Sequence, residues 1–441
     1  MYVTQVFAQY AAQYREQPLS QHVLHHARRA VIDWYASVFP GFETQPVRLL
    51  IEAVAEDLDR GSARLATGRV ATARTAALIN GAAAHAAEVD DSFRDAMYHP
   101  GAATIAAALA AAQSCGADGL AFLRAVVLGY EVSTRIGVAM GREHYKYWHN
   151  TGTVGTFGAA ASAAYLLQLD EAAFAHALAT AATFAAGLQQ AFRMDSMSKP
   201  FHPGRAAEGG LLAAQLAARG ITGSLDIFEG EAGFGRAMSG KADWSHVGET
   251  LGRDFNITRL TFKNHIGCGH AFPAIDGALA LQRQHGIDAA DVEQVHVATY
   301  KPALDIACYM NPATDNEARF SIPFVVATAL VHGSVRMAAY EPQRLADPRT
   351  RALLERVSVS VDPEIDAGFP GRRAARVEIT LRDGRRLVHL QPNRKGDPEQ
   401  PLDDPELESK LVELAQPVIG ADAVRTLAAR LWSLDAGQAL P

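Results

Sequence analysis

The amino-acid sequence predicts a mainly α-helical protein, with a large helical domain and a smaller α+β domain. Apolar residues recur at helical spacing up to about residue 220, whereas apolar and polar residues alternate in several stretches beyond about residue 255. Helical spacing returns after residue 405. A chain of 441 residues, 49% hydrophobic and 20% charged, holds enough apolar material for two cores. We therefore expect residues 1–255 with 405–441 to form the helical domain and residues 256–404 to form the α+β domain.

The first domain is expected to be helical throughout, because Ala, Leu, Glu and Gln are abundant and Gly, Pro and Asp separate the periodic stretches. Small residues cover nearly every face of residues 105–112 and 159–166, which suits close packing deep in a helix bundle. The predicted helices cover residues 2–14, 20–39, 47–57, 72–87, 102–114, 119–140, 153–167 and 171–184.

The second domain is expected to combine strands and helices. Alternating stretches at residues 292–300, 356–361 and 376–390 predict half-buried strands. Asp383 and Gly384 lie within the last of these stretches, and an Asp-Gly pair there indicates a hairpin turn. Helical patterns interrupt the strands, so we expect an α+β arrangement. These patterns cover residues 271–285, 322–331 and 350–354.

Composition argues against several classes of protein. A formal net charge of −7 and a pI near 6.1 oppose binding to nucleic acid or to an anionic membrane. Cys115, Cys268 and Cys308 offer no disulfide framework and fit a reducing compartment. No run approaches the about 18 uncharged apolar residues of a membrane-spanning helix, and the first residues lack a signal-peptide pattern. We therefore expect a cytoplasmic protein.

Common cofactor motifs are absent from the sequence. There is no GxGxxG after a predicted strand, no GxxxxGK[ST], no HExxH and no paired CxxC. Instead, five segments place ionisable residues within otherwise apolar helical sequence, which packing alone disfavours. These segments are the candidates for a chemical site.

The first segment is AAAHAAEVDDSFRDAMYHPG, which contains His85, Glu88, Asp91 and His99. On a helix, Glu88 and Asp91 would follow His85 at three-residue spacing, so the three groups would share one face and shift one another's pKa. The alternative is a solvated helix end with Asp91 or Ser92 near a cap.

The second segment is GREHYKYWHNTGTVGTFGAAAS, which places His149 at the entrance of a predicted helix of small residues. The first backbone N–H groups of such a helix attract carboxylates. The alternative is an aromatic-rich surface loop in which Thr151 or Thr153 caps the helix.

The third segment is MDSMSKPFHPGRAAEGGLLAAQLA, in which Lys199, His202 and Arg205 stand before another helix. Two cations and a histidine at a helix entrance indicate a clamp for carboxylates. Ordinary surface charge is the alternative.

The last two segments are TFKNHIGCGHAFPAID and CYMNPATDNEARFSIP. His265, Cys268 and His270 could ligate zinc, but their spacing matches no usual closed site, and a loop thiol with core histidines is favoured. No GxSxG elbow supports a nucleophilic site. The candidates from these segments are Lys263, His265, Cys268, His270, Tyr309 and Arg319.

Taken together, these segments resemble the MmgE/PrpD family, which includes 2-methylcitrate dehydratase, cis-aconitate decarboxylase and iminodisuccinate epimerase. The resemblance runs from about residue 4 to about residue 390. It implies a helical domain completed by the C-terminal tail, a smaller α+β lid domain, a homodimer, and a pocket between the domains without metal or organic cofactor. The motifs that carry it are AHAAEVDD followed by HPG, GYEVSTR, WHNTGTVGTFGAAASAAYLL, SKPFHPGRAAEGGLLAAQLAARGITG and NEARFSIPF.

The resemblance also assigns site residues. The implied catalytic positions are Glu88, His99, His149, Lys199, Lys263 and Tyr309. The candidates for substrate contacts are Asp91, His202, Arg205, His270 and Arg319.

Three departures from the family pattern touch the pocket. Glu88 replaces the common Asp, and the stretch between Asp91 and His99 is longer by one residue. Phe272 stands where many members have His, and His270 is the candidate to replace that histidine in space.

The expected reaction is proton abstraction from a carbon next to a carboxylate of a small di- or tricarboxylate, followed by loss of a β-leaving group, usually water. Such a C–H is weakly acidic, so the developing charge needs cations that are already in place. Lys199, Lys263 and Arg205 would supply them.

Proton transfer needs a base and an acid. His149 or Glu88 would be the base, and His99 or Tyr309 would protonate the leaving group. The same pocket would run an epimerisation if the intermediate were reprotonated on its opposite face, or a decarboxylation if carbon dioxide left. A non-catalytic acid-binding protein with the same fold is the alternative from another class.

Overall fold

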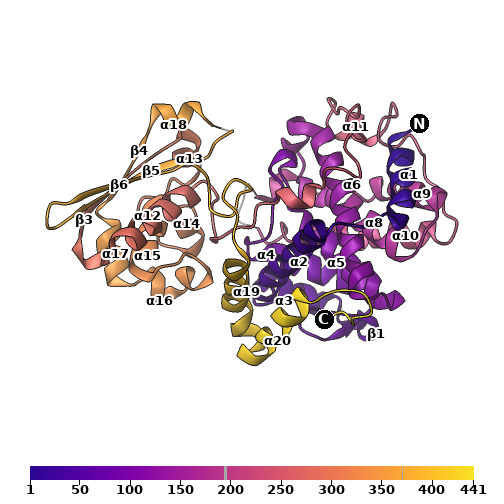
Figure 1. The fold of residues 1–441 in the computed structure, drawn as a ribbon, viewed down its shortest axis with the longest axis horizontal. Coiled ribbons are helices and arrows are strands. Elements are labelled where there is room, and N and C mark those ends of the chain that lie inside the picture. The colour runs from indigo at the N-terminus through magenta and orange to yellow at the C-terminus, as the bar shows by residue number, and fades with distance from the viewer. Residues whose placement is uncertain (193–195, 370) are drawn as a thin grey trace. The chain divides into compact units, whose positions relative to one another are not determined.

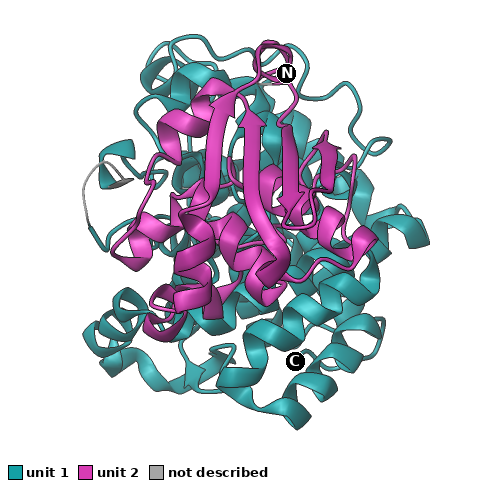
Figure 2. Cartoon of the chain, turned by 90° about the vertical axis from the view of Figure 1, so that its left-hand side faces the viewer, with its two compact units in different colours: residues 1–262, 403–441 teal, residues 263–402 magenta. Residues whose placement is uncertain are grey.

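The structure is a computed structural model that describes residues 1–192, 196–369 and 371–441, and these residues form two compact units (Figure 2). Unit 1 comprises Met1–Phe262 and Asp403–Pro441, and unit 2 comprises Lys263–Leu402. The predicted fold class, mainly helical with a smaller α+β part, is confirmed. Within the described ranges, none of the helices combines the length and the apolar character that crossing a membrane requires.

Unit 1 is a bundle of helices (Figure 1), several of which start at a short polar side chain that accepts a backbone N–H. Ser20, Thr72, Asp118 and Asp170 each accept the backbone N–H of the residue three positions later, which satisfies one free donor at each helix start. The helices before the tail are α1 (Val3–Glu16), α2 (Gln21–Phe42), α3 (Gln45–Ala53), α4 (Ala73–Ala86), α5 (Pro100–Cys115), α6 (Gly119–Tyr145), α7 (Asn150–Thr153), α8 (Gly155–Leu166), α9 (Glu171–Ala182), α10 (Phe201–Ala217) and α11 (Phe234–Met238).

Unit 1 also contains a short hairpin, so the expectation that this part is helical throughout was wrong. Strands β1 (Leu58–Arg64) and β2 (Val70–Ala71) pair antiparallel between α3 and α4. Gly61 and Gly68 adopt φ values of 93° and 95°, which other residues rarely adopt. A two-residue strand and a strand with glycine inside it give no alternating pattern, so periodicity could not reveal them.

Glycines let α10 lie very close to two neighbouring helices. A Cβ atom on Gly210 would lie 2.5 Å from the Thr156 carbonyl oxygen of α8, and one on Gly204 would lie 2.6 Å from the Leu78 carbonyl oxygen of α4. Every residue of α8 is buried, as its small residues predict. This close packing brings the start of α10 beside the chain that leads into α7 and α8.

The C-terminal segment completes unit 1 with helices α19 (Asp404–Ile419) and α20 (Ala421–Trp432), and α19 packs against α2. Lys410 of α19 lies inside the unit with no exposed side-chain surface. Its Nζ donates to Asp33 Oδ1 of α2 at 2.6 Å and to the Val89 carbonyl oxygen at 2.8 Å. The segment after α4 is therefore bonded to a residue more than three hundred positions later in the sequence.

Unit 2 is built around one four-stranded mixed sheet with strand order β4-β3-β5-β6 (Figure 1). Strands β3 and β4 are parallel, whereas β5 pairs antiparallel with β3 and with β6. Helix α12 packs against β5 and β6, and α15 packs against α12, α17 and β4. The elements are α12 (Phe272–His285), β3 (Val292–Thr299), α13 (Lys301–Ile306), α14 (Asp315–Arg319), α15 (Ile322–His332), α16 (Pro342–Leu345), α17 (Pro348–Leu354), β4 (Val357–Val361), α18 (Pro363–Ala367), β5 (Ala375–Leu381) and β6 (Arg386–Gln391).

Candidate active site

The segment between α4 and α5 carries the first group of candidate residues. Helix α4 ends at Ala86, and Glu88 has a φ of 59°, in the left-handed region. The prediction that His85, Glu88 and Asp91 share one helical face is therefore wrong, because the helix stops before Glu88. A left-handed glutamate costs on the order of 1 kcal/mol, and such strain is tolerated where the surrounding structure fixes it, often at functional sites.

Two histidines of this segment are held by backbone and carboxylate oxygens. His85 is fully buried, and its Nδ1 lies 2.7 Å from Asp90 Oδ2. His99 caps the start of α5, and its Nδ1 lies 2.6 Å from the Asp91 carbonyl oxygen and 3.4 Å from Asp90 Oδ2. A carbonyl oxygen can only accept, so Nδ1 of His99 carries the proton, and in the neutral ring Nε2 is the basic nitrogen.

Asp91 supports the segment from inside the protein. Its Oδ1 accepts the Gly101 N–H at 3.0 Å and its Oδ2 accepts the Tyr130 hydroxyl at 2.8 Å. Burial, followed by the nearby charge of Asp33, raises the pKa of Asp91 to about 8. The carboxyl group that was expected to contact substrate is thus engaged by protein donors, and it anchors the start of α5.

The raised pKa of Asp91 predicts a pH-dependent stability. The folded-state pKa lies above the unfolded value near 3.8, so ionisation of Asp91 weakens the folded state as pH rises from about 4 to about 8. Between about pH 5.5 and pH 7.5, we expect the wild type to lose about 2 kcal/mol more unfolding free energy than Asp91→Asn does. Urea unfolding at both pH values measures this difference, and equal losses in the two proteins would contradict it.

His149 and His202 extend the cluster from two other helices. His149 caps α7, and His202 lies in the first turn of α10. Their Nδ1 atoms are 3.0 Å apart, and the His149 ring centroid lies 5.3 Å from that of His85. Burial, then the neighbouring His85 and Lys199, lowers the pKa of His149 well below its usual range and that of His202 to about 4. Both rings are therefore neutral at pH 7.

Lys199 brings a cation to this cluster. Its Nζ forms an ion pair with Glu88 Oε1, and both side chains are partly exposed. Lys199 also contributes to the lowered pKa of His149 and of His202, which shows that it lies near both rings. Arg205 does not join the group, because its side chain is 68% exposed and pairs with Glu208 one turn further along α10.

The histidine–carboxylate part of the cluster also has the spacing of metal ligands. One donor atom from each of His85, Asp90 and His99 lies within 4.8 Å of the others, the one such group in the described part of the chain. Histidine and carboxylate ligands suit zinc and related ions. Asp90 also has another function, because its Oδ2 forms a hydrogen bond with His85 and lies 3.4 Å from His99 Nδ1, so it orients imidazoles.

In unit 2, Lys263, Cys268 and His270 lie in the segment that leads into α12. Burial raises the pKa of the Cys268 thiol, while Arg373 and Lys263 oppose that shift. Burial, then Arg373 and Arg394, lowers the pKa of His270 to about 4. The His270 Nδ1 lies 2.9 Å from the Tyr300 hydroxyl oxygen, so a neutral His270 is fixed beside a tyrosine.

The other candidates of unit 2 have structural partners. The His265 Nε2 lies 2.8 Å from Asp276 Oδ1, and both residues are buried. The Arg319 guanidinium lies over the Tyr340 ring at 4.4 Å from its centroid. Tyr309, by contrast, is 40% exposed to solvent. Of the predicted catalytic positions, the structure thus brings Glu88, His99, His149 and Lys199 together in unit 1, whereas Lys263 and Tyr309 belong to unit 2.

Sequence reasoning missed three participants of the unit 1 cluster. His85 and Asp90 stand in the first segment but were not chosen as site residues, and Tyr130 stands in the GYEVSTR motif. The signal for His85 was its place inside an alanine-rich buried helix, where an imidazole needs a partner. Tyr130 gave no such signal, because a buried tyrosine in a helix is ordinary core.

This group of imidazoles and carboxyls with a lysine at its edge, on a helical scaffold, is an arrangement that can move protons. Matches to known proteins show the family. The chain belongs to the MmgE/PrpD family, because residues 5–247 match the MmgE/PrpD N-terminal domain and residues 265–434 match the MmgE/PrpD C-terminal domain.

Curated relatives include enzymes of two kinds. The chain is 29% identical to the cis-aconitate decarboxylase-like protein oryM of Aspergillus oryzae, over 82% of this chain and 80% of that protein. It is 27% identical to human cis-aconitate decarboxylase, over 80% of this chain and 74% of that protein. It is 28% identical to 2-methylcitrate dehydratase of Salmonella typhimurium, over 40% of each chain.

Proposed function

We propose that this protein is a lyase that needs no cofactor and moves a proton at a carbon next to a carboxylate of a small di- or tricarboxylate. One observation carries the proposal: the Lys199–Glu88 ion pair lies beside the imidazoles of His149 and His202, whose pKa values are lowered. Neutral imidazoles can accept a proton at pH 7, and a lysine beside them can hold the negative charge that develops.

In the proposed mechanism, a substrate carboxylate replaces Glu88 as the partner of Lys199. The released Glu88 or the neutral His149 takes the proton from the adjacent carbon. His99 keeps its Nδ1 proton on the Asp91 carbonyl oxygen, so its Nε2 can accept a proton and then, as the imidazolium, donate it to the leaving hydroxyl. In the dehydration, the C–H and the β C–O bonds break, an alkene forms, and the leaving hydroxyl departs as water after protonation.

Dehydration is the reaction that the sequence analysis predicts, and 2-methylcitrate dehydratase supports it over part of the chain. Decarboxylation is the second candidate, because the cis-aconitate decarboxylases match about four-fifths of the chain. There, the C–C bond to a carboxylate would break, carbon dioxide would leave, and a proton would be added to the allylic carbanion. Both reactions use the same lysine and the same acid–base residues.

The test is incubation of the purified protein with 2-methylcitrate, cis-aconitate or iminodisuccinate in deuterated water, followed by NMR and carbon dioxide detection. Loss of water supports the dehydratase, and carbon dioxide with deuterium in the product supports the decarboxylase. Deuterium exchange without net loss would instead identify an epimerase. Binding of all three acids with neither exchange nor turnover would contradict the proposal and favour a non-catalytic acid-binding protein.

Two further parts of the proposal are checked in the same preparation. Activity that survives dialysis against EDTA supports chemistry without a metal, whereas loss and recovery with zinc would assign His85, Asp90 and His99 as ligands. Light scattering tests the homodimer that the family resemblance implies.

A further inference from the structure

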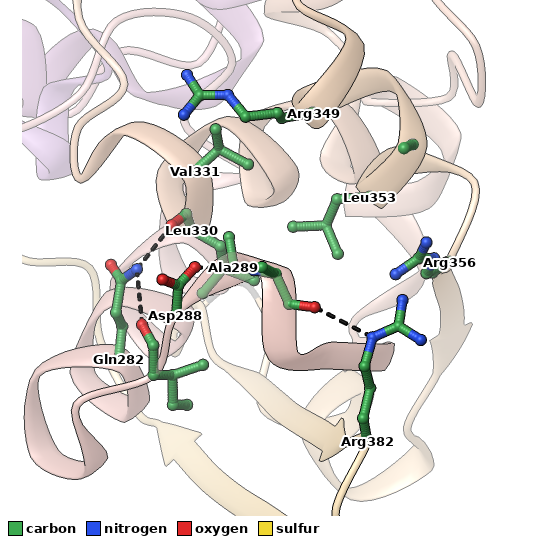
Figure 3. Close-up of a pocket in the computed structure, with 12 residues that line it drawn as sticks. Gln282, Asp288, Ala289, Leu330, Val331, Arg349, Leu353, Arg356 and Arg382 are labelled. Atoms are coloured by element: carbon green, nitrogen blue, oxygen red, sulfur yellow. Dashed lines mark hydrogen bonds between the residues drawn. The ribbon is translucent and has the colours of Figure 1, made fainter.

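Unit 2 contains a pocket of about 520 Å³ that includes none of the candidate site residues (Figure 3). It lies between the end of α12, the turn before β3, and helices α15 and α17. The volume falls within the range of about 300–1,000 Å³ that small-molecule sites usually occupy. The pocket is thus large enough for a small organic molecule.

Two guanidinium groups are fixed at one end of this pocket. Arg356 Nη1 donates to the Val292 carbonyl oxygen at 3.0 Å, and Arg382 Nε donates to the Ala290 carbonyl oxygen at 3.1 Å. The two carbonyls are two residues apart, one in the 3-10 turn before β3 and one at the first residue of β3, so both guanidinium groups are held near this point. Figure 3 shows Arg356 and Arg382 at the same end, with their guanidinium groups turned toward each other.

These two charges are not neutralised by the protein. A carbonyl oxygen accepts a hydrogen bond without cancelling the charge of the donor, and each guanidinium has five N–H groups. Among the described residues, neither Arg356 nor Arg382 forms an ion pair. The acidic residue in the pocket wall, Asp288, accepts the Ala290 N–H at 2.9 Å and keeps its charge, but among the described residues it forms no ion pair with either arginine. The third arginine, Arg349, is paired with Asp347.

Apolar residues form another part of the wall. Ile287, Leu330 and Leu353 are buried residues that line the pocket, and Val331 lies beside them. A pair of guanidinium groups suits the planar or tetrahedral oxygens of carboxylate and phosphate. An apolar wall next to that pair favours a ligand with a short hydrocarbon body.

We propose that this pocket binds a small amphipathic organic anion, with a carboxylate or phosphate group between Arg356 and Arg382 and a hydrocarbon body along Leu330 and Leu353. The site shares no residue with the histidine cluster of unit 1. Binding of an anion at this site can therefore be tested independently of the proposed lyase activity.

Calorimetric titration of the full chain with hexanoate and with hexyl phosphate tests the proposal and distinguishes the two head groups. We expect one of them to bind at one site per chain, about tenfold or more tighter than acetate or inorganic phosphate. The double variant Arg356→Gln/Arg382→Gln should lose at least about tenfold in affinity. Binding should survive in His149→Ala and should not be displaced by cis-aconitate.

The matched control is Arg385→Gln, which removes an exposed arginine that pairs with Asp383 in the nearby hairpin and does not line the pocket. It should bind as the wild type does. Ala289→Trp, which fills the pocket without changing its charge, should also abolish binding. Circular dichroism melting checks that each variant is folded. Unchanged binding in the folded double variant, or equal binding of uncharged hexanol, overturns the proposal.

Discussion

Replacement of Lys199 by methionine is expected to lower kcat/KM for the preferred polycarboxylate by about 10²–10³-fold. Methionine keeps most of the side-chain length but removes the cation that would hold the substrate carboxylate, and loss of one partner of a hydrogen-bonded charge pair costs about 2–5 kcal/mol. Steady-state kinetics measure the change. The fold should survive, because Lys199 is partly exposed.

Two companion variants sharpen this prediction. Arg205→Met removes a cation from the same segment, but its side chain is exposed and paired with Glu208, so we expect less than a twofold change. Glu88→Gln should lower kcat by about 10²-fold or more, as loss of a general base does, while KM falls because Lys199 loses its internal partner. An Arg205 effect as large as that of Lys199 would restore the carboxylate clamp inferred from sequence and contradict this assignment.

The second large effect is expected for Lys410→Met, which should reduce the free energy of unfolding by about 3–5 kcal/mol. Lys410 and Asp33 have no exposed side-chain surface, and Lys410 Nζ lies 2.6 Å from Asp33 Oδ1. Removal of the lysine leaves a carboxylate inside the bundle without its cation. Urea unfolding, followed by circular dichroism, measures the loss.

The control for this prediction is a double variant, Asp33→Asn with Lys410→Met. It leaves no buried charge at this position, so it should be more stable than Lys410→Met alone. Lys241→Met, at an exposed position of unit 1, should stay within about 0.5 kcal/mol of the wild type. A loss below about 1 kcal/mol in Lys410→Met would show that the buried pair contributes little.

Local patterns were enough to predict most elements of the fold. The Asp383-Gly384 pair predicted the turn between β5 and β6, and the structure places Gly384 there with a φ of 85°. Strand β5 alternates buried and half-buried residues along its whole length, which is the pattern that periodicity detects. The hairpin of β1 and β2 was not predicted because β2 has only two residues and the buried and exposed residues of β1 do not alternate.

The partners of the site residues could be predicted only in part. The segments that carry Glu88, His99, His149 and Lys199 were recognised from ionisable residues in apolar surroundings, and the structure brings these four together. The outward direction of Arg205 could not be predicted, because it depends on where α10 begins and which face it buries. Residue type indicates chemistry, but the direction of a side chain depends on packing.

The contact between Lys410 and Asp33 lay beyond any local pattern. The two residues are separated by 377 positions, and Lys410 occupies an amphipathic tail helix where an exposed lysine is the ordinary expectation. Lys410 lies in the protein interior only because α19 packs against α2. Long-range pairs of this kind are set by tertiary structure alone.

The position of Lys410 also has a consequence for biosynthesis. A nascent chain leaves the ribosome from its N-terminus, so Asp33 and Val89 emerge long before the lysine that binds both of them. During translation of the whole of unit 2, the surface of α2 that α19 later covers is open to water and to chaperones. The segment that bears Glu88 and Asp90 therefore acquires its bond from Lys410 to the Val89 carbonyl oxygen only after α19 has been translated.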